Sequence, residues 1–573
     1  ATQNKQMYIR LHCLPQQCRP FGPQFENFRL EKNAMPTLEW IGKNKVVNHH
    51  QEVPFRVLER QYSFDEQGQH TENNGSENMI IHGDNLEALK ALLPQYEGKV
   101  KCIYIDPPYN TGNEGWCYND NVSDPHIQKW LGEVVGKEGE DLTRHDKWLC
   151  MMYPRLMLLQ KLLADDGVIF ISIDDNELYN LKSICDEIFG ASCYVSDIAW
   201  QRTYSTRNDS KGIVNEVEHI LVYSKEPEWN PNKLPRTAEM DAKYKNPDND
   251  VSAWRTSDAF APGAATHQGM VYAIQHPFTG KMLYPSNGAC WRYQQDTMLE
   301  IMNGWTKYEL QDLHDEKERA HVCGISPDEV RPDVKAIVLA DPLEVASANA
   351  QKVLERGQWP RFFFTKGGKG GIARKTYLEN VGGRLPTNFW PFSETGHTDE
   401  AKKEMLAIFD GKATFDTPKP HRLIEFVLKV AGTKDALILD SFAGSGTTAH
   451  AVLNMNKADG GHRKFILVEM GDYADTITAE RVKRVIKGYG EGKNAAEGTG
   501  GCFSYYELGE PLLLPSGNLN EKVGTEKIRD YIWYIETKKP LPDHKNNNPY
   551  FIGENNSTAY YLSLIHISEP TRP

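Results

Sequence analysis

Short apolar runs alternate with longer amphipathic stretches along most of the chain. The short runs have the length of buried strands, whereas the longer stretches repeat apolar residues at the spacing of a helix face. Strands that alternate with helices form βαβ units, so the pattern predicts a doubly wound, mostly parallel α/β sheet. In chain order the first predicted elements are the strand 79–83, the helix 84–93, the strand 102–106, the helix 148–164, the strand 168–173 and the helix 177–189.

This alternation is interrupted in the middle of the chain. Two alternating runs, 196–205 and 218–225, predict a β-hairpin at the edge of the sheet. Proline, glycine, aromatic and charged residues then mix without a period from 226 to 391. We therefore expect an α/β domain in two halves, 35–225 and 392–515, with an inserted domain at 226–391. The elements predicted after the insertion are the strand 436–440, a helix within 441–455, the strand 464–470 and the helix 474–489.

The two ends of the chain lack this pattern. Residues 1–34 show neither helical nor alternating periodicity, and we interpret them as upstream read-through or a disordered tail, with Met35 as the start. Residues 562–573 include LSLIHISEPTR, which resembles a translated sequencing adaptor, so we interpret them as an artefact. The region 516–561 is then a truncated C-terminal region.

Composition excludes several classes of protein. No apolar window reaches the ~18 residues of a membrane span, and the first residues lack the layout of a signal peptide, so we expect a cytoplasmic protein. The ten cysteines form no C-x-x-C pair and no Cys/His cluster at zinc-ligand spacing. We therefore expect neither a disulfide framework nor a bound metal.

The charge is distributed unevenly. The chain has a formal net charge of −13, yet 352–390 contains eight Lys or Arg and two Glu, a net of +6, together with seven aromatic residues. Phosphate contacts and base stacking use such a mixture, which predicts a nucleic-acid interface. The alternative is a solvated basic loop. The candidate contacts are Arg361, Lys366, Lys369, Arg374 and Lys375.

The predicted strand 102–106 ends in the sequence Asp106-Pro107-Pro108-Tyr109. In open α/β sheets, ligands bind beyond the carboxyl ends of the strands, where these residues fall. The prolines stiffen the backbone and have no N–H, so their carbonyls are free to act as acceptors beside the carboxylate. Acceptors next to an aromatic face suit a planar ring that carries an NH2 group. The alternative is an ordinary turn with a solvated aspartate.

A second motif follows the strand 436–440. Gly444, Gly446 and Ala449 fit G-x-G-x-x-A between a strand and a helix, and Glu469 at the end of the next strand is placed to accept from ribose hydroxyls. The motif alone also describes a nicotinamide or flavin site. Asp440 could meet the amino group of a cationic ligand, which favours a nucleoside cofactor with an amino acid portion and a sulfonium charge.

Together the two motifs resemble the beta class of DNA amino-methyltransferases, in which the target-base motif precedes the S-adenosylmethionine motif. HGDNLEAL, PTNFWPFSETGHTDEAKKEM and FDTPKPHRLIEFVL, with the long insertion, resemble more specifically the modification (Mod) subunit of type III restriction-modification systems, over about 35–509. The resemblance implies a Rossmann-like methyltransferase sheet with an inserted target-recognition domain. It also implies double-stranded DNA as substrate, a modification-subunit homodimer, and a separate restriction subunit with helicase and nuclease functions.

The resemblance implies methylation of the N6 amino group of a flipped-out adenine, because N4-cytosine enzymes more often have Ser at the position of Asp106. Asp106 and the Pro107 carbonyl would bind the target amino group beside Pro108, and Tyr109 would stack on the base. By the same resemblance, Asp440, Phe442, Gly444 and Gly446 would bind the cofactor's methionine end, Glu469 its ribose and Asp84 its adenine, while Phe415, Lys419 and Pro420 would close the pocket. Thr447 is a further candidate cofactor contact.

Three other functions stay open. The chain could be a solitary DNA methyltransferase, for adenine or cytosine, without a nuclease partner. It could be a nicotinamide-dependent enzyme in which the target-base motif is a coincidence. It could also be a DNA-binding specificity protein that has lost catalysis, although such a protein would not need both motifs intact.

Overall fold

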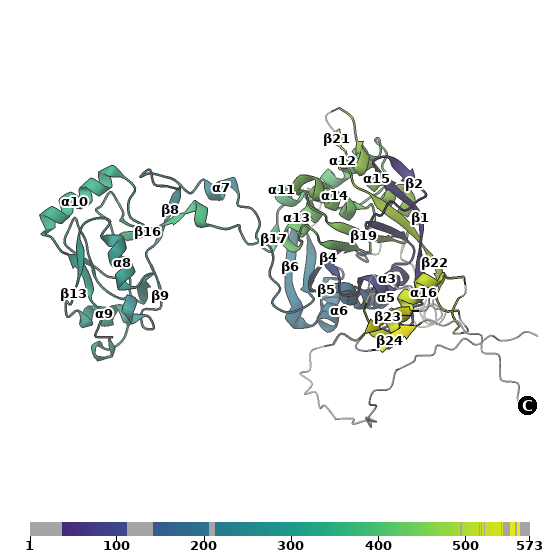
Figure 1. Ribbon diagram of the computed structural model, residues 1–573, viewed down its shortest axis with the longest axis horizontal. Helices are drawn as coiled ribbons and strands as arrows, with labels where there is room; N and C mark the ends of the chain where they lie inside the picture. Colours follow the sequence, from purple (N-terminus) through teal and green to yellow (C-terminus); the bar gives the residue numbers. More distant parts are fainter. Residues whose placement is uncertain are drawn as a thin grey trace, which may run out of the picture. The chain divides into compact units, whose positions relative to one another are not determined.

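The computed structural model describes residues 37–111, 141–204, 212–492, 495–514, 516, 518–520, 522–539, 541, 551–555 and 558–561. The interpretations of 1–34 and 562–573 lie outside these residues. The chain divides into two compact units, which are Ala1–Asn232 with Pro386–Pro573, and Lys233–Leu385 (Figure 1). The second unit lies within the stretch 226–391 that the sequence analysis expects to be an insertion.

A large mixed sheet forms the centre of the first unit. In spatial order its described strands are β17 (Phe389–Trp390), β6 (Tyr194–Gln201), β7 (Val217–Ser224), β5 (Leu163–Ile173), β4 (Val100–Ile105), β18 (Leu437–Asp440), β19 (Lys464–Glu469), β3 (Met79–His82), β22 (Phe503–Pro511), β1 (Arg56–Asp65) and β2 (Gly68–His70). The run from β5 to β22 is parallel throughout. The predicted α/β class with a mostly parallel sheet is therefore confirmed.

Both edges of the sheet differ from the sequence prediction. The strands β6 and β7 do pair antiparallel, but β17 adds to β6, so the hairpin is not the outermost element. The strands β1, β2 and β22 were not predicted, because charged and polar residues interrupt their apolar positions. The predicted helix 148–164 ends at Leu162, since β5 begins at Leu163.

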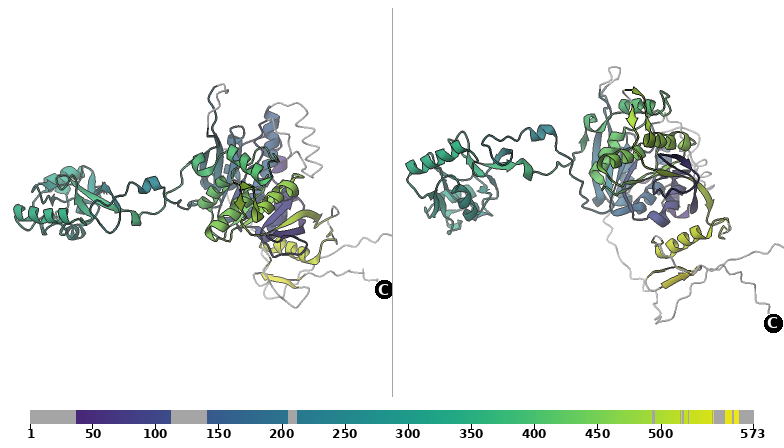
Figure 2. Two further views of the ribbon diagram at one scale, coloured as in Figure 1. Left: turned by 90° about the horizontal axis from the view of Figure 1, so that it is seen from above. Right: turned by 45° about the horizontal axis from the view of Figure 1, so that its top comes forward.

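Helices cover both faces of the sheet (Figures 1 and 2). On one face lie α3 (Asn85–Tyr96), α5 (Asp141–Leu162) and α6 (Leu178–Phe189), and on the other lie α13 (His421–Ala431), α14 (Thr447–Asp459) and α15 (Glu480–Lys487). Ile103 and Ile105 of β4 pack in the core with α3 and α5, while the alternate residues Cys102 and Tyr104 are buried on the opposite face. Burial on both faces is the normal state of parallel strands.

Shorter elements complete the first unit. The predicted helix 474–489 starts as a π-helical segment, Ala474–Ala479, and α15 ends before Gly488, whose φ is 98°. None of the described helices combines the length and the apolarity needed to cross a bilayer. The remaining elements are α1 (Lys43–Val46), α2 (His49–Glu52), α11 (Phe392–Thr395), α12 (Thr398–Ile408), β20 (Gly488–Tyr489), β21 (Ala496–Glu497), α16 (Thr525–Thr537), β23 (Phe551–Asn555) and β24 (Thr558–Tyr561).

The second unit, Lys233–Leu385, has its own aromatic core, which includes Trp254, Trp291, Trp305 and Phe362. Its described strands form the small sheets β11-β10-β14-β13, β15-β16-β8 and β12-β9. Its elements are α7 (Ala238–Asp241), β8 (Trp254–Asp258), β9 (Phe260–Pro262), β10 (Ile274–Gln275), β11 (Met282–Leu283), β12 (Ala289–Trp291), α8 (Gln295–Met302), β13 (Tyr308–Gln311), α9 (Glu316–Cys323), β14 (Ala336–Leu339), α10 (Leu343–Arg356), β15 (Phe362–Phe364) and β16 (Ile372–Tyr377).

Candidate active site

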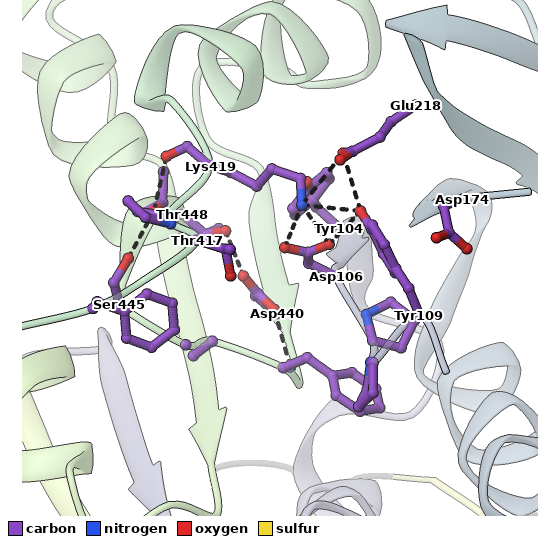
Figure 3. Close-up of a pocket in the computed structure, with 18 of the residues that line it drawn as sticks. Tyr104, Asp106, Tyr109, Asp174, Glu218, Thr417, Lys419, Asp440, Ser445 and Thr448 are labelled. Atoms are coloured by element: carbon purple, nitrogen blue, oxygen red, sulfur yellow. Dashed lines mark hydrogen bonds and ion pairs between the residues drawn. The ribbon is translucent and has the colours of Figure 1, made fainter. Parts of the chain in front are cut away.

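The two sequence motifs meet at one edge of the sheet. The strands β4 and β18 are parallel neighbours, with Ile438 opposite Cys102 and Leu439 opposite Ile103. Their carboxyl ends therefore place Asp106 and Asp440 side by side, around a cavity of about 430 Å³ (Figure 3). The cavity is lined by Tyr104, Asp106, Pro107, Pro108, Tyr109, Asn110, Thr111, Trp148, Asp174, Arg202, Glu218, Phe415, Thr417, Pro418, Lys419, Asp440, Phe442, Ala443, Gly444, Ser445, Thr447, Thr448 and Tyr473.

Asp106 is the centre of a hydrogen-bonded cluster on one side of this cavity. The Lys419 ammonium lies 2.7 Å from each carboxylate oxygen of Asp106, and the Tyr109 hydroxyl donates to Oδ1 at 2.8 Å. Burial, followed by the charges of Asp106 and Glu218, raises the pKa of Tyr109 well above its ordinary value, which keeps the hydroxyl protonated. The carboxylate and the aromatic ring of the target-base motif therefore form one unit.

Hydrogen bonds to neighbouring side chains hold the target-base motif in place. The Trp148 indole N–H donates to the carbonyl of Pro108 at 2.7 Å. Asn110, which has a left-handed φ of 58°, donates from its side-chain amide to Glu177, and His145 Nδ1 lies 2.5 Å from the same carboxylate. Because the side chain of Glu177 is completely buried, these bonds fix the turn that follows β4.

Glu218 of β7 is a site residue that the sequence analysis missed. It is buried, its Oε1 accepts from Arg202 at 2.8 Å, and its Oε2 lies 3.2 Å from the Tyr109 hydroxyl oxygen, which makes its shorter hydrogen bond to Asp106. Although burial raises it, the charges of Lys419 and Arg202 hold the pKa of Glu218 below its ordinary value. The signal in the sequence was a charged residue at the start of an otherwise apolar strand, EHILVYS.

Glycine is required at two positions of the loop after β18. Gly444 and Gly446 have φ values of 52° and 81°. A Cβ on Gly444 would lie 3.2 Å from the ring of Phe415, and one on Gly446 would lie 2.9 Å from the carbonyl oxygen of Thr478. The backbone of this loop can therefore approach a ligand closely. The rings of Phe415 and Tyr473 pack edge to face beside it, with their centroids 5.8 Å apart, and both line the cavity.

Asp440 is the buried carboxylate on the cofactor side of the cavity. It accepts from the backbone N–H of Phe442 at 3.0 Å and from the Thr448 hydroxyl at 2.5 Å. Burial, with smaller effects of the charges on Asp106 and Glu469, raises the pKa of Asp440 to about 7. A carboxylate in this position favours a positively charged ligand.

Several predicted cofactor residues support the cavity wall without lining it. Glu469 accepts from the N–H of Gly444 at 2.7 Å and of Gly471 at 2.9 Å. Asp84 caps α3 by accepting from Leu86 and Glu87, while Pro420 and Gly446 are the residues that precede α13 and α14. Thr447, Phe442 and Phe415 do line the cavity, as does Lys419, which contacts Asp106.

A buried polar network lies behind the glycine loop. The Arg481 guanidinium, which is completely buried, donates to Ser445 Oγ at 2.9 Å, to Thr447 Oγ1 at 2.7 Å and to Glu404 at 3.1 Å. His421 contacts the other oxygen of Glu404 at 2.6 Å. The network therefore ties the start of α13 to the glycine loop. Glu404, His421 and His450 lie close enough together to ligate a metal, but the guanidinium donates to Glu404 and to His450 there.

The predicted nucleic-acid contacts in the second unit differ in exposure. Arg361, Lys366 and Lys369 are exposed, and Arg374 is half-buried. Lys375 has an exposed fraction of 0%, and its ammonium is bound by Asp248 and Asp250 at 2.5 Å each. The prediction that Lys375 contacts nucleic acid is therefore wrong. Its ammonium is buried in ion pairs with Asp248 and Asp250 and does not reach the surface.

Arg292 lies near Arg361 and Arg374, two of the predicted nucleic-acid contacts on the second unit. Arg361 precedes Phe362, which is paired with Arg374 in the sheet. Arg292 donates to the carbonyl of Asp258, next to the residue that pairs with Arg374 on the other side. Burial and the charges of Arg292 and Arg361 lower the pKa of Arg374. Arg361 lies 5.7 Å from the ring centroid of Tyr293. None of the three arginines forms an ion pair with an acidic residue in the described part of the chain. We call Arg292, Arg361 and Arg374 the arginine cluster.

Comparisons with known proteins agree with this geometry. Residues 100–480 match the family model described as "DNA methylase". The chain is 33% identical over 466 residues to the "Type III restriction-modification enzyme StyLTI Mod subunit" of Salmonella typhimurium, covering 77% of this chain and 61% of that protein. It is 28% identical to the "Type III restriction-modification enzyme EcoP15I Mod subunit" of Escherichia coli, covering 76% and 64%. The chain thus spans less than two thirds of these relatives.

A solved structure, "PvuII DNA methyltransferase (cytosine-N4-specific)", aligns with a TM-score of 0.32 and 12% identity, covering 71% of this chain and 86% of that one.

Proposed function

We propose, on the premise that the chain belongs to the DNA methylase family, that it transfers a methyl group from S-adenosylmethionine to an amino group of a base in double-stranded DNA. One observation supports this most directly. The carboxylate of Asp106 and the ring of Tyr109 share a single cavity with Asp440 and the glycine loop. A nicotinamide-dependent enzyme would have no use for the first pair.

The residues on the cofactor side fit S-adenosylmethionine. The buried Asp440 carboxylate suits the ligand's positively charged groups, and the absence of a Cβ at Gly444 leaves backbone exposed beside the Phe415 ring. Phe442, Thr447 and Tyr473 complete this side. S-adenosylmethionine supplies a methyl group on a positively charged sulfur, which is a good leaving group. Glu469 is proposed to bind the ribose of S-adenosylmethionine, and Asp84 to bind its adenine. Gly446 and Pro420 are proposed to shape the loops around the cofactor.

The residues on the target side suit an amino group on an aromatic ring. Asp106 accepts one N–H, and the carbonyl of Pro107 is the proposed second acceptor because Trp148 already donates to the carbonyl of Pro108. Two acceptors localise the nitrogen lone pair that the ring otherwise delocalises. Tyr109 stacks on the base, which must leave the duplex to enter the cavity. Positioning then contributes most of the rate.

The arginine cluster is the proposed DNA contact surface of the second unit, together with Lys366 and Lys369 on the turn between β15 and β16. Guanidiniums without acidic partners beside an aromatic ring suit phosphates and stacked bases.

The similarity to Mod subunits supports a further assignment. The chain acts as the adenine-specific modification subunit of a type III restriction-modification system, as a homodimer beside a restriction subunit, in the bacterial cytoplasm on DNA. A solitary methyltransferase, for adenine or cytosine, is the second candidate.

The proposed reaction is tested by incubating the chain with tritium-labelled S-adenosylmethionine and unmethylated plasmid DNA, followed by digestion to nucleosides. Label in N6-methyladenine supports the adenine assignment, and label in N4-methylcytosine would change the target base. Absence of label, together with absence of S-adenosylmethionine binding by calorimetry, would refute the proposal. Fluorescence enhancement of added NADH would favour the nicotinamide alternative.

A further inference from the structure

The Lys419 ammonium donates three hydrogen bonds, and all three go to the target-base motif (Figure 3). Its Nζ lies 2.7 Å from Oδ1 and 2.7 Å from Oδ2 of Asp106, and 2.9 Å from the hydroxyl of Tyr109. The same ammonium lies 5.0 Å from the centroid of the Tyr109 ring. An ammonium has three N–H donors, so these contacts use all of them.

These contacts are the ones that the proposed reaction requires of the target amino group. The target must also donate to Asp106 and lie against the Tyr109 ring. A neutral amino group competes poorly with an ammonium for a carboxylate, because a charge-assisted hydrogen bond is about twice as strong as a neutral one. Lys419 must therefore release part of Asp106 before the target base binds.

A released ammonium needs another partner, because the Lys419 side chain is only 11% exposed and an unpaired charge at such a site is costly. Glu218 provides one. Its Oε2 lies 3.6 Å from Lys419 Nζ, which is just beyond hydrogen-bond length, and its Oε1 is fixed by Arg202 at 2.8 Å. A shift of about 1 Å would bring the ammonium into hydrogen-bond distance of Glu218.

We infer that Lys419 is a movable counter-ion, which pairs with Asp106 before the target base arrives and shifts to Glu218 when the target amino group takes its place. Glu218 is thus a positioning residue, because it acts through Lys419. The inference rests on the proposed function. It agrees with the raised pKa of Lys419, which burial lowers but which the charges of Asp106 and Glu218 raise further.

Single-turnover methylation at saturating S-adenosylmethionine and DNA tests this exchange. Glu218→Gln keeps the shape of the side chain but removes the charge that receives Lys419. We expect methyl transfer to fall about tenfold to a hundredfold, the range for one hydrogen bond to a charged group, while cofactor affinity stays within about twofold. In a Lys419→Met background, Glu218→Gln should cost nothing more. The inference would be overturned if Glu218→Gln reduced methyl transfer equally in the wild-type and Lys419→Met backgrounds, or if it caused no loss in the wild-type background.

A second variant covers the case in which Lys419→Met does not fold. Glu218→Asp keeps the charge on a shorter side chain and should recover much of the activity that Glu218→Gln loses. If Glu218 only accepts a hydrogen bond from Tyr109, the Gln variant should be at least as active as the Asp variant, and that result would overturn the inference.

Binding gives a readout apart from turnover. With S-adenosylhomocysteine present, duplexes that carry adenine or purine at the target position differ only in the amino group. The wild type should prefer adenine, and Glu218→Gln should lose most of that preference; a retained preference would contradict the exchange. If the wild type neither transferred methyl groups nor bound DNA, the proposed function would be refuted, and so would the exchange of Lys419 between Asp106 and Glu218.

Discussion

Asp440 should make cofactor binding depend on pH. In the free protein the pKa of this carboxyl is raised from 3.8 to about 7 by burial, so it holds a proton in mildly acidic solution. Binding a positively charged ligand beside it favours the carboxylate, so the proton leaves when the ligand binds. Cofactor affinity should therefore increase with pH up to about pH 7 and then level off.

The size of the effect follows from the shift. Each pH unit below a pKa of about 7 should cost about tenfold in affinity, so binding should be about 30-fold weaker at pH 5.5 than at pH 8.

The raised pKa of Asp440 also makes the stability of the ligand-free protein depend on pH. Because the unfolded chain has already lost this proton near pH 4, this group lowers the free energy of unfolding as the pH rises from about 4 to 7, by about 4 kcal/mol in total.

Calorimetric titration with S-adenosylmethionine, in two buffers of different ionisation enthalpy, measures both the affinity and the protons released. We expect close to one proton released at about pH 6 and almost none at about pH 8.5. Asp440→Asn should remove this difference, because the ligand's own amino group titrates equally in both proteins. Asp165→Asn, at an exposed position, is the matched control. Equal proton release from the wild type and Asp440→Asn would show that Asp440 is not the group that loses a proton on cofactor binding.

Three further variants test the hydrogen bonds that support the site and the proposed DNA surface. Trp148→Phe removes the donor to the Pro108 carbonyl, and should lower the free energy of unfolding in urea by roughly 1–3 kcal/mol and slow methyl transfer more than it weakens cofactor binding. An unchanged stability would show that the bond contributes nothing. Replacing Arg361 and Arg374 with Glu should weaken DNA binding and flatten its dependence on salt at normal stability. In contrast, Lys375→Met should lower stability by roughly 3–5 kcal/mol; the opposite pattern would contradict the assignment.

The parts of the site that the sequence predicted are those carried by local motifs. Asp106 follows β4 directly, and Tyr109 and Gly444 lie in the loops that follow β4 and β18, so the order of strands and helices was enough to place them at the carboxyl edge of a sheet. The mostly parallel sheet was predictable for the same reason. Its β1 and β22 edge was not, because charged and polar residues interrupt the apolar positions of these partly exposed strands.

The remaining parts depend on contacts between distant segments. Lys419 is 313 residues from Asp106 along the chain, and nothing in the sequence indicates that its ammonium contacts that carboxylate. Glu218 faces the cavity only because β7 pairs with β5. Lys375 shows the converse error, since a lysine in a basic stretch was taken as exposed although Asp248 and Asp250 neutralise it in the interior. Charge along the sequence does not reveal which basic residues are already paired.

The central claim is that Asp106 directs methyl transfer to an amino group in DNA. It is tested most directly by single-molecule sequencing of DNA from a methylation-deficient bacterial host that expresses either the wild-type chain or Asp106→Asn. Asn keeps the size of the side chain but removes the charge that localises the nitrogen lone pair. We expect N6-methyladenine at one short sequence with the wild type and almost none with the variant, while calorimetry shows similar cofactor affinity for both proteins. Equal methylation by both proteins would contradict the claim.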